Sequence, residues 1–278
     1  MMKSLFSILL LSILVVACAN AQYYYKDIIT NKQISSEMQG HKDKKIHTVN
    51  IKSFEDDGSP SEGFYCQKKI SRDYRKVEVL TKSNQVAPSI FTSLFNENGR
   101  VISTNDSSSI FSSTTRYMYD NAGRLTNVIS ISRSDDDDFR NEMREEHIYR
   151  YNSNNDYPEK MVRVRNSTDS ITIQFALDER NNLGIEKDSK TGNKFYYYYD
   201  EKNRPTDIVS SNDFKKGLVP TYVFEYNNSG LITQMTVSEE GIGNYLIWKY
   251  NYEDGLRVRE KCYSKDRRLL GTIEYEYK

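Results

Sequence analysis

The side chains that most often bind metals or transfer protons are scarce in this sequence. Among its 278 residues there are three cysteines and three histidines, His41, His47 and His147. No histidine lies at a ligand spacing from another histidine or from Cys66 or Cys262, so the sequence predicts no metal site and no cofactor. We expect the three histidines to lie on the surface or in hairpins.

Carboxylates are plentiful, but their spacing singles out no catalytic pair. The run from Asp135 to Asp138 could attract calcium, yet it lacks the alternating ligands and central glycine of a calcium loop, so we expect a solvated loop between strands. There is no Gly-x-Ser-x-Gly elbow, no phosphate-binding glycine loop and no Cys-His arrangement with recognisable surroundings. The sequence therefore predicts a protein that is not an enzyme. A secreted polysaccharide hydrolase is the alternative, because a carboxylate pair is formed in space and leaves no local pattern.

Aromatic side chains are the remaining candidates for contact with a ligand. Two expected strands each carry three of them on one face: Phe195, Tyr197 and Tyr199 on the first, and Trp248, Tyr250 and Tyr252 on the second. An exposed row could stack on sugar rings or proteins, whereas a packed row is cross-strand core. The pattern recurs along the chain, which favours core. Tyr196 and Tyr198 point the opposite way, and with Trp248 they are our candidate binding residues.

These aromatic residues belong to a phrase that is repeated along the chain. Two aromatics separated by one residue precede Asp or Asn, then come two or three polar residues, often with glycine, and then an alternating segment. The Asp, Asn or Glu of the phrase stands at positions 96, 120, 152, 178, 200, 227 and 253, in steps of 24, 32, 26, 22, 27 and 26 residues. Steps that vary this much indicate a motif with loops of variable length.

Each unit has the pattern of an antiparallel β-hairpin. Alternation places Tyr222, Phe224 and Tyr226 on one face of a strand. An Asp or Asn at the strand end can accept a hydrogen bond from the backbone two residues later and start a turn. Seven such units predict at least fourteen strands in meander order, so the expected fold is all-β. Open sheets rarely exceed about 10 strands, and we expect a curled or superhelically wound sheet.

Winding and closure into a barrel differ in what they predict for the cysteines. Closure would bring Cys66 and Cys262, which lie near opposite ends of the mature chain, close to each other. Winding would keep them apart. We favour winding, which predicts two free thiols.

Residues 117–125 read Tyr-Met-Tyr-Asp-Asn-Ala-Gly-Arg-Leu, which resembles the tyrosine-aspartate repeat of Rhs-type bacterial surface proteins. The units around Tyr199 and Tyr226 are similar, and the resemblance spans about residues 90–278. It implies a bacterial surface or secreted protein whose repeats build a wound antiparallel sheet that serves as shell, spacer or binding surface. The chain departs from the pattern at Glu253 and in the 149–161 unit, which has no glycine. A small stand-alone module of the kind common in exported Bacteroidetes proteins fits better than a toxin-encasing role.

The N-terminal residues have the pattern of an export signal. An apolar run from Leu5 to Ala17 is too short for a membrane span, and a small-x-small site ends at Ala21, which predicts a signal peptide over residues 1–21. The alternative is a lipoprotein signal over residues 1–17, with Cys18 lipidated. We expect residues 22–89 to be a diverged N-terminal β segment or cap of the sheet, or a small separate domain, and residues 90–278 to be the hairpin repeats.

Composition and charge limit the functions. Formal net charge is zero and mean hydropathy is −0.74, while aromatic residues make up 12% of the chain. Balanced charge argues against nucleic-acid binding, and the aromatic content argues against disorder. We therefore expect an exported module that binds a protein or glycan at the cell envelope, in the periplasm, on the cell surface or secreted. An outer-membrane lipoprotein and an outer-membrane β-barrel are alternatives. For the main hypothesis we expect no transmembrane helix, and contact with the membrane only through a possible lipid anchor.

Overall fold

The computed structural model describes residues 23–84, 87–109, 111–134, 142–152, 156–211, 218–238 and 243–278. The predicted export signal with Cys18 and the Asp135 to Asp138 run lie outside these residues. The described part contains one long helix and a single sheet of 18 strands.

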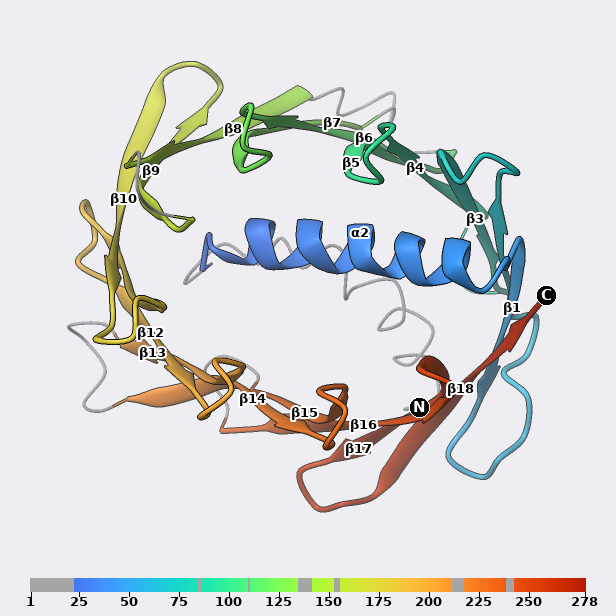
Figure 1. The fold of residues 1–278 in the computed structure, drawn as a ribbon. Helices are drawn as coiled ribbons and strands as arrows, with labels where there is room; N and C mark the ends of the chain where they lie inside the picture. Colours follow the sequence, from blue (N-terminus) through green and yellow to red (C-terminus); the bar gives the residue numbers. More distant parts are fainter. Residues whose placement is uncertain are drawn as a thin grey trace.

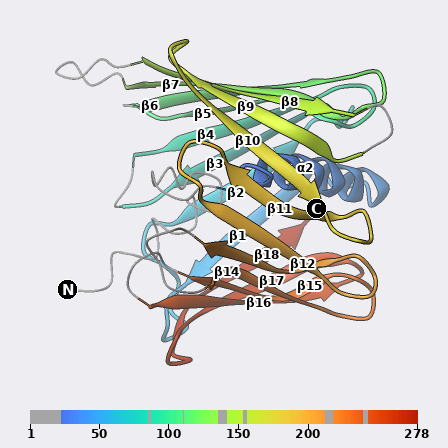
Figure 2. The same cartoon turned by 90° about the vertical axis from the view of Figure 1, so that its left-hand side faces the viewer.

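The sheet is an antiparallel meander, as the repeated hairpins predicted, and it closes into a barrel (Figures 1 and 2). The strands are β1 (Thr48–Phe54), β2 (Tyr65–Ile70), β3 (Lys76–Lys82), β4 (Ser89–Phe95), β5 (Val101–Ser107), β6 (Phe111–Tyr119), β7 (Leu125–Ser134), β8 (Glu142–Tyr151), β9 (Pro158–Arg165), β10 (Asp169–Leu177), β11 (Leu183–Asp188), β12 (Lys194–Tyr199), β13 (Pro205–Ser211), β14 (Val219–Tyr226), β15 (Ile232–Ser238), β16 (Tyr245–Glu253), β17 (Leu256–Ser264) and β18 (Leu269–Tyr277). The all-β antiparallel fold class is thereby confirmed.

Closure is made by the first and last strands. β1 pairs with β18 from Val49 opposite Tyr277 to Phe54 opposite Thr272, and it pairs with β2 on its other side. The backbone N–H of Lys278 also donates to the carbonyl of Thr48 at 2.8 Å. The sheet is therefore closed, where we had favoured a wound sheet. Closure removes both unpaired edges, which a wound sheet of this length would leave open to pairing with other chains.

Cys66 and Cys262 form no disulfide, as expected of a wound sheet, and both are buried. The reason differs from the one we gave, because closure does not bring them together. Cys66 lies on β2 and Cys262 on β17, so β1 and β18 stand between them. Three interstrand steps of about 4.8 Å separate the two chains by about 14 Å, twice the Cα distance that a disulfide tolerates.

A helix, α2 (Lys26–Asp43), lies inside the barrel and crosses its lumen (Figure 1). This corrects the expectation that the whole of residues 22–89 would be β-structure; β1 to β3 of the barrel follow the helix. The buried residues of the helix are Ile28, Asn31, Met38 and His41, of which two are polar. A buried stripe that is half polar has no helical hydrophobic period, so the sequence pattern could not reveal it.

The repeated phrase forms the hairpin turns at one rim of the barrel. In the turn between β12 and β13, the carboxylate of Asp200 accepts hydrogen bonds from the backbone N–H groups of Lys202 and Arg204, both at 2.9 Å. Asn203 takes a positive φ of 58°, which asparagine tolerates better than most residues. The acid or amide of the phrase thus holds the turn in the way that its position predicted.

The second tyrosine of the phrase points into the lumen and links its unit to the preceding one. Its hydroxyl donates to the carbonyl of a residue at or next to the start of the preceding return strand. The pairs are Tyr119 with Val101, Tyr151 with Leu125, Tyr199 with Leu183, Tyr226 with Pro205, Tyr252 with Ile232 and Tyr277 with Arg257. These rings are therefore core residues whose polar ends are satisfied.

An arginine strengthens the same link in several units. The guanidinium of Arg204 lies 4.5 Å from the centre of the Tyr226 ring and donates to the carbonyl of Asn227 at 3.2 Å. Arg124 makes the equivalent contacts with Tyr151 and Asn152. Cation–π contacts of this kind contribute about 0.5–2 kcal/mol, so consecutive hairpins are joined by an aromatic, a polar and a cationic contact at once.

Candidate functional site

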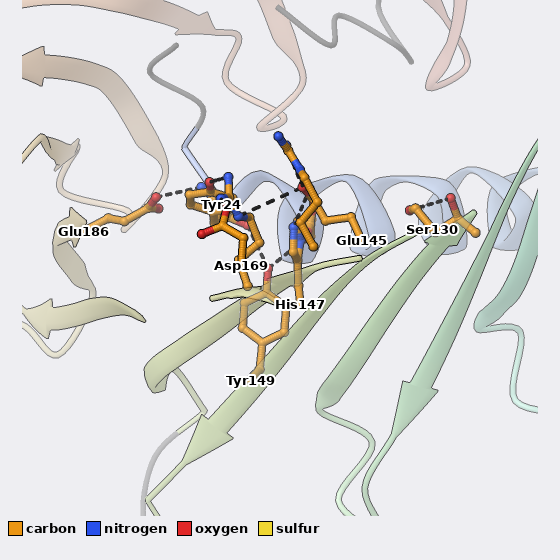
Figure 3. A network of polar contacts seen from close by, with 11 residues as sticks. Tyr24, Ser130, Glu145, His147, Tyr149, Asp169 and Glu186 are labelled. Carbon is orange, nitrogen blue, oxygen red and sulfur yellow. Dashed lines mark hydrogen bonds and ion pairs between the residues drawn. The ribbon is translucent and has the colours of Figure 1, made fainter. Parts of the chain in front are cut away.

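A network of polar contacts lies in the lumen, where the first turn of α2 meets the wall of β8 (Figure 3). Glu145, His147 and Tyr149 occupy alternate positions of β8 and so share its inward face. The imidazole of His147 lies between two carboxylates, with Nδ1 at 2.5 Å from Asp27 and Nε2 at 3.0 Å from Glu145. The Tyr149 hydroxyl is 2.8 Å from the carbonyl oxygen of Tyr24 and 2.9 Å from Asp27.

The two carboxylates set the charge of His147. Burial opposes the charged imidazole, but Asp27 and Glu145 raise the pKa of His147 to about 9. Burial likewise opposes the charge of Glu145, yet His147 and Arg165 lower the pKa of that carboxyl to about 2. At neutral pH the cluster is thus a buried imidazolium held between two carboxylates.

Glu186 of β11 holds the start of the helix from another part of the wall. Its carboxylate accepts from the backbone N–H groups of Tyr24 at 2.7 Å and Tyr25 at 3.0 Å, and from the Tyr197 hydroxyl at 2.8 Å. N–H groups at a helix start have no partner within the helix, and the helix dipole favours an anion there. Glu186 is buried, which raises its pKa to about 7.

Two arginines of β9 extend the network toward the neighbouring strands. Arg165 donates to Glu145 through Nε at 3.0 Å and Nη2 at 2.8 Å. Arg163 donates to Asp169 at 2.9 Å and to the Tyr24 hydroxyl at 3.2 Å. Three strands of the wall, β8, β9 and β10, therefore take part in binding the segment that leads into α2.

The arrangement holds the helix in place. Both ring nitrogens of His147 are engaged, one by Asp27 and the other by Glu145. The nearby hydroxyl of Ser130 pairs with Thr115 at 3.0 Å. Within the described ranges no group of three or more His, Cys, Asp or Glu side chains could hold a metal ion.

The other end of α2 is also fixed to the wall. Glu37 forms an ion pair with Lys68 of β2, and Met38 packs in a cluster with Val49, Phe95 and Val101. His41 is buried near Tyr277, and burial lowers its pKa to about 4, so this histidine is neutral at neutral pH. The helix therefore spans the lumen between two anchored ends.

Three sequence expectations about single residues change with these positions. Trp248 is 3% exposed and packs with Tyr250, Cys262 and Ile273 on the inner wall, so it is core and not a contact surface. His41 and His147 are buried, where we expected surface or hairpin positions. A tryptophan or histidine on a strand gives no local signal for the side that will face the lumen, because that depends on closure.

Tyr196 and Tyr198 do lie on the outer wall, as their alternation predicted. Tyr198 is 46% exposed. Tyr196 belongs to a row of opposed apolar residues on four neighbouring strands, β11 to β14, with an irregularity in the ladder next to Val209: Ile185, Tyr196, Val209 and Pro220. Val209 is only 7% exposed although it faces outward beside Tyr196. We call this row, together with Tyr198, the outer tyrosine patch.

The outer wall of β16, β17, β18 and β1 is charged. Arg259 of β17 pairs with Glu274 of β18 at 2.8 Å, and Lys52 of β1 pairs with Glu276 of β18. Lys249 and Asn251 of β16 are also exposed. The outer tyrosine patch therefore differs from the charged wall of β17, β18 and β1, while other exposed apolar side chains lie on β4 to β6 at Ile90, Leu94, Ile102 and Met118.

Sequence reasoning missed the residues of the lumen network. Asp27, Glu145, His147 and Glu186 come from three elements far apart in the chain. The one local signal is the alternation of Glu145, His147 and Tyr149, which indicates one strand face but not that this face is buried.

Comparisons with known proteins identify no family. No protein-family model and no curated protein matches the chain. Solved structures that resemble it include a porin-like protein from Bacteroides uniformis, with 11% identity, a TM-score of 0.38 and coverage of 84% of this chain and 98% of that one. The Tc holotoxin pore of Photorhabdus luminescens has 14% identity and a TM-score of 0.35, with 80% of this chain and 11% of that one covered.

A further structure is a DUF3598 protein of unknown function from Nostoc punctiforme, with 9% identity, a TM-score of 0.16 and coverage of 84% and 96%. At these levels the likenesses support no statement about function. The resemblance to tyrosine-aspartate repeats stays a prediction. In the part of the chain that the structure describes, no helix has the length and apolar character needed to cross a membrane.

Proposed function

We propose that this protein is an exported, non-enzymatic barrel that binds a protein or a glycan at the cell envelope, and that the outer tyrosine patch is its contact surface. The observation that carries the proposal is the apolar row from Ile185 through Tyr196 and Val209 to Pro220, with the exposed ring of Tyr198 beside it. Tyrosine combines apolar area with a hydrogen-bonding group, which suits it to contacts with proteins and sugars.

The helix in the lumen is an argument for a contact surface on the outer wall. Helix α2 crosses it and is fixed at both ends by buried polar contacts. The aromatic core of the inner wall packs against the start of this helix, with Tyr25 in contact with Phe175 and Tyr197. These contacts occupy part of the lumen, whereas Tyr198 on the outer wall is exposed without rearrangement.

The charges of the outer wall favour water over lipid around the barrel. A membrane barrel needs an outward apolar band about 25 Å tall on every strand. Here Lys52, Arg259 and Glu274 face outward on adjacent strands of the charged side. An outer-membrane barrel therefore fits the wall less well than an exported barrel in an aqueous compartment.

The exposed carboxylates favour binding over hydrolysis. A hollow on the charged side is lined by Glu253, Glu274 and Glu276. A glycosidase needs one carboxyl that stays protonated as a general acid. Glu274 is paired with Arg259, and Lys52 lowers the pKa of Glu276, so Glu276 is held as a carboxylate.

A glycan array and a pull-down from envelope extract, both with the mature protein, test the proposal. We expect the double variant Tyr196→Ser, Tyr198→Ser to lose at least tenfold in affinity for the ligand found, and Tyr263→Ser, an outward tyrosine on charged strand β17, to bind as the wild type does. Equal binding by the double variant and by Tyr263→Ser would show that the outer tyrosine patch is not the contact surface. Reproducible hydrolysis of a polysaccharide, lost on replacing one carboxylate, would overturn the non-enzymatic assignment.

A further inference from the structure

The ladder between β1 and β2 opens before the two strands end. Pairing runs from Thr48 opposite Lys69 to Ile51 opposite Cys66 and then stops. Beyond that point the connection folds back on β1, where Phe54 and Pro60 form an isolated bridge. The strands therefore separate on the outer wall and leave a hollow of about 400 Å³ between them.

The hollow is held open by hydrogen bonds within the connection. Ser61 donates its backbone N–H to the carbonyl of Ser53 at 2.8 Å, and the hydroxyls of these two buried serines lie 2.9 Å apart. Glu55 donates its N–H to the carbonyl of Ser59 at 2.8 Å. A hollow fixed in this way exists before any ligand arrives, which lowers the entropic cost of binding.

Rings and polar groups share the lining of the hollow. Phe54, Phe64 and Tyr65 supply three aromatic rings, and Tyr65 is 45% exposed. Asn50, Lys52, Ser61 and Glu276 supply polar atoms. The volume falls within the range of about 300–1,000 Å³ for small-molecule sites, which are mostly apolar with a few polar groups.

The charges of the hollow favour a neutral ligand. Lys52 and Glu276 form an ion pair at its edge, so the net charge there is close to zero. The amide oxygen of Asn50 accepts from Gln67 at 2.9 Å, which fixes the Asn50 side chain. A charged ligand would compete with the ion pair, whereas hydroxyl groups can both donate to Glu276 and accept from Lys52.

We propose that this hollow binds a neutral pyranose sugar. The apolar C–H face of the ring lies against Tyr65 and Phe64, and its hydroxyl groups bond to Asn50, Lys52 and Glu276. The inference rests on the proposed binding function and deepens it, because it names a second site and the class of its ligand. Alternating aromatic residues in the sequence could not reveal this site, since its rings come from strand ends and from an irregular connection.

Titration of the mature protein with methyl glycosides of glucose, galactose, mannose and N-acetylglucosamine, followed by saturation-transfer NMR, tests the inference. We expect millimolar or tighter binding of at least one glycoside, a loss of at least tenfold in Tyr65→Ala and in Phe64→Ala, and retention in Tyr65→Phe. The matched control is Tyr263→Ala, in which an outward tyrosine of β17 that belongs to neither proposed site is removed and binding should persist. Far-UV circular dichroism and thermal unfolding establish that each variant is folded.

The outcomes separate this inference from the proposed function. A glycoside that binds Tyr65→Ala as it binds the wild type, and is lost in Tyr198→Ala, would overturn the hollow as the sugar site and leave the binding function in place. Capture of a peptide or protein, with no glycoside bound, would likewise overturn the hollow as the sugar site and leave the binding function in place. Failure of every glycan and protein ligand, together with hydrolytic activity, would overturn both.

Discussion

At the scale of single residues, the folded barrel depends on buried polar groups that each have a partner. His147 is the clearest case, because a buried imidazolium would be unstable without Asp27 and Glu145. The lumen tyrosines follow the same rule, since each hydroxyl reaches a carbonyl of the neighbouring unit. A buried polar group left without its partner costs about 1–3 kcal/mol, so conservative changes at these positions have measurable effects.

The charge of His147 predicts how stability varies with pH. Its pKa is about 9 in the folded barrel and 6.5 ordinarily, so the folded state binds this proton more tightly. The stabilisation is complete below about pH 6.5 and is lost as pH rises to about 9, by on the order of 3 kcal/mol. Denaturant unfolding at pH 6 and pH 9 should show this loss in the wild type and a much smaller one in His147→Gln. An equal loss in both would contradict the charged assignment.

A second prediction at this scale concerns the tyrosine ladder. Tyr199→Phe removes the hydroxyl that donates to the carbonyl of Leu183 at 2.9 Å, and we expect the free energy of unfolding to fall by about 1–2 kcal/mol. Tyr198→Phe, one position along on the exposed face, should change it by less than about 0.5 kcal/mol. Urea titrations of the two variants make the comparison, and an equal effect would show that the ladder contributes no stability.

At the scale of elements, helix α2 is held by the wall more than by its own sequence. Its buried face includes Asn31 and His41, and the Asn31 amide donates to the Tyr119 hydroxyl at 2.7 Å. Its first turn depends on Glu186 for two backbone N–H groups. Because the hairpins have their own ladders and their own tyrosine links, the helix should open at a lower free energy than the strands.

Replacing Glu186 tests this order of stability. In Glu186→Ala the N–H groups of Tyr24 and Tyr25 lose their acceptor, so we expect faster amide exchange over residues 23–43 while β6, β7, β16 and β17 stay protected. Glu186→Gln keeps an acceptor oxygen and should give an intermediate rate. Hydrogen exchange read by mass spectrometry makes the measurement. Equal acceleration in the strands would mean that helix and barrel unfold as one unit.

At the scale of the whole molecule, closure is the feature that a cross-link can test directly. Asn50 and Glu276 are opposite each other across β1 and β18, and such antiparallel pairs have Cα atoms about 4.5–5.5 Å apart, within reach of a disulfide. We expect the double variant Asn50→Cys, Glu276→Cys to form an intramolecular disulfide under mild oxidation, read by mass spectrometry. The pair Asn50→Cys, Asn251→Cys, with β17 and β18 between its members, should not. A wound, open sheet would form neither.

Local patterns in the sequence determined the hairpins. Alternation assigned Tyr197 to the inner face and Tyr198 to the outer face, and the Asp or Asn of each phrase marked the turn, because strand pleat and turn hydrogen bonds involve neighbours within about four residues. The same patterns predicted an all-β meander too long to remain flat and open. The sequence predicted at least fourteen strands and the structure has 18, since β1 to β3 lie in a segment that lacks the repeated phrase.

Only the tertiary structure decided closure, the helix in the lumen and the sites. Pairing of β1 with β18 joins residues from opposite ends of the chain, and no local pattern reports a contact at that separation. The same holds for Glu186, which meets Tyr24 from 162 residues away. The sequence by itself set which side chains alternate and where the chain turns, whereas which face became the interior, and what filled it, followed from long-range pairing.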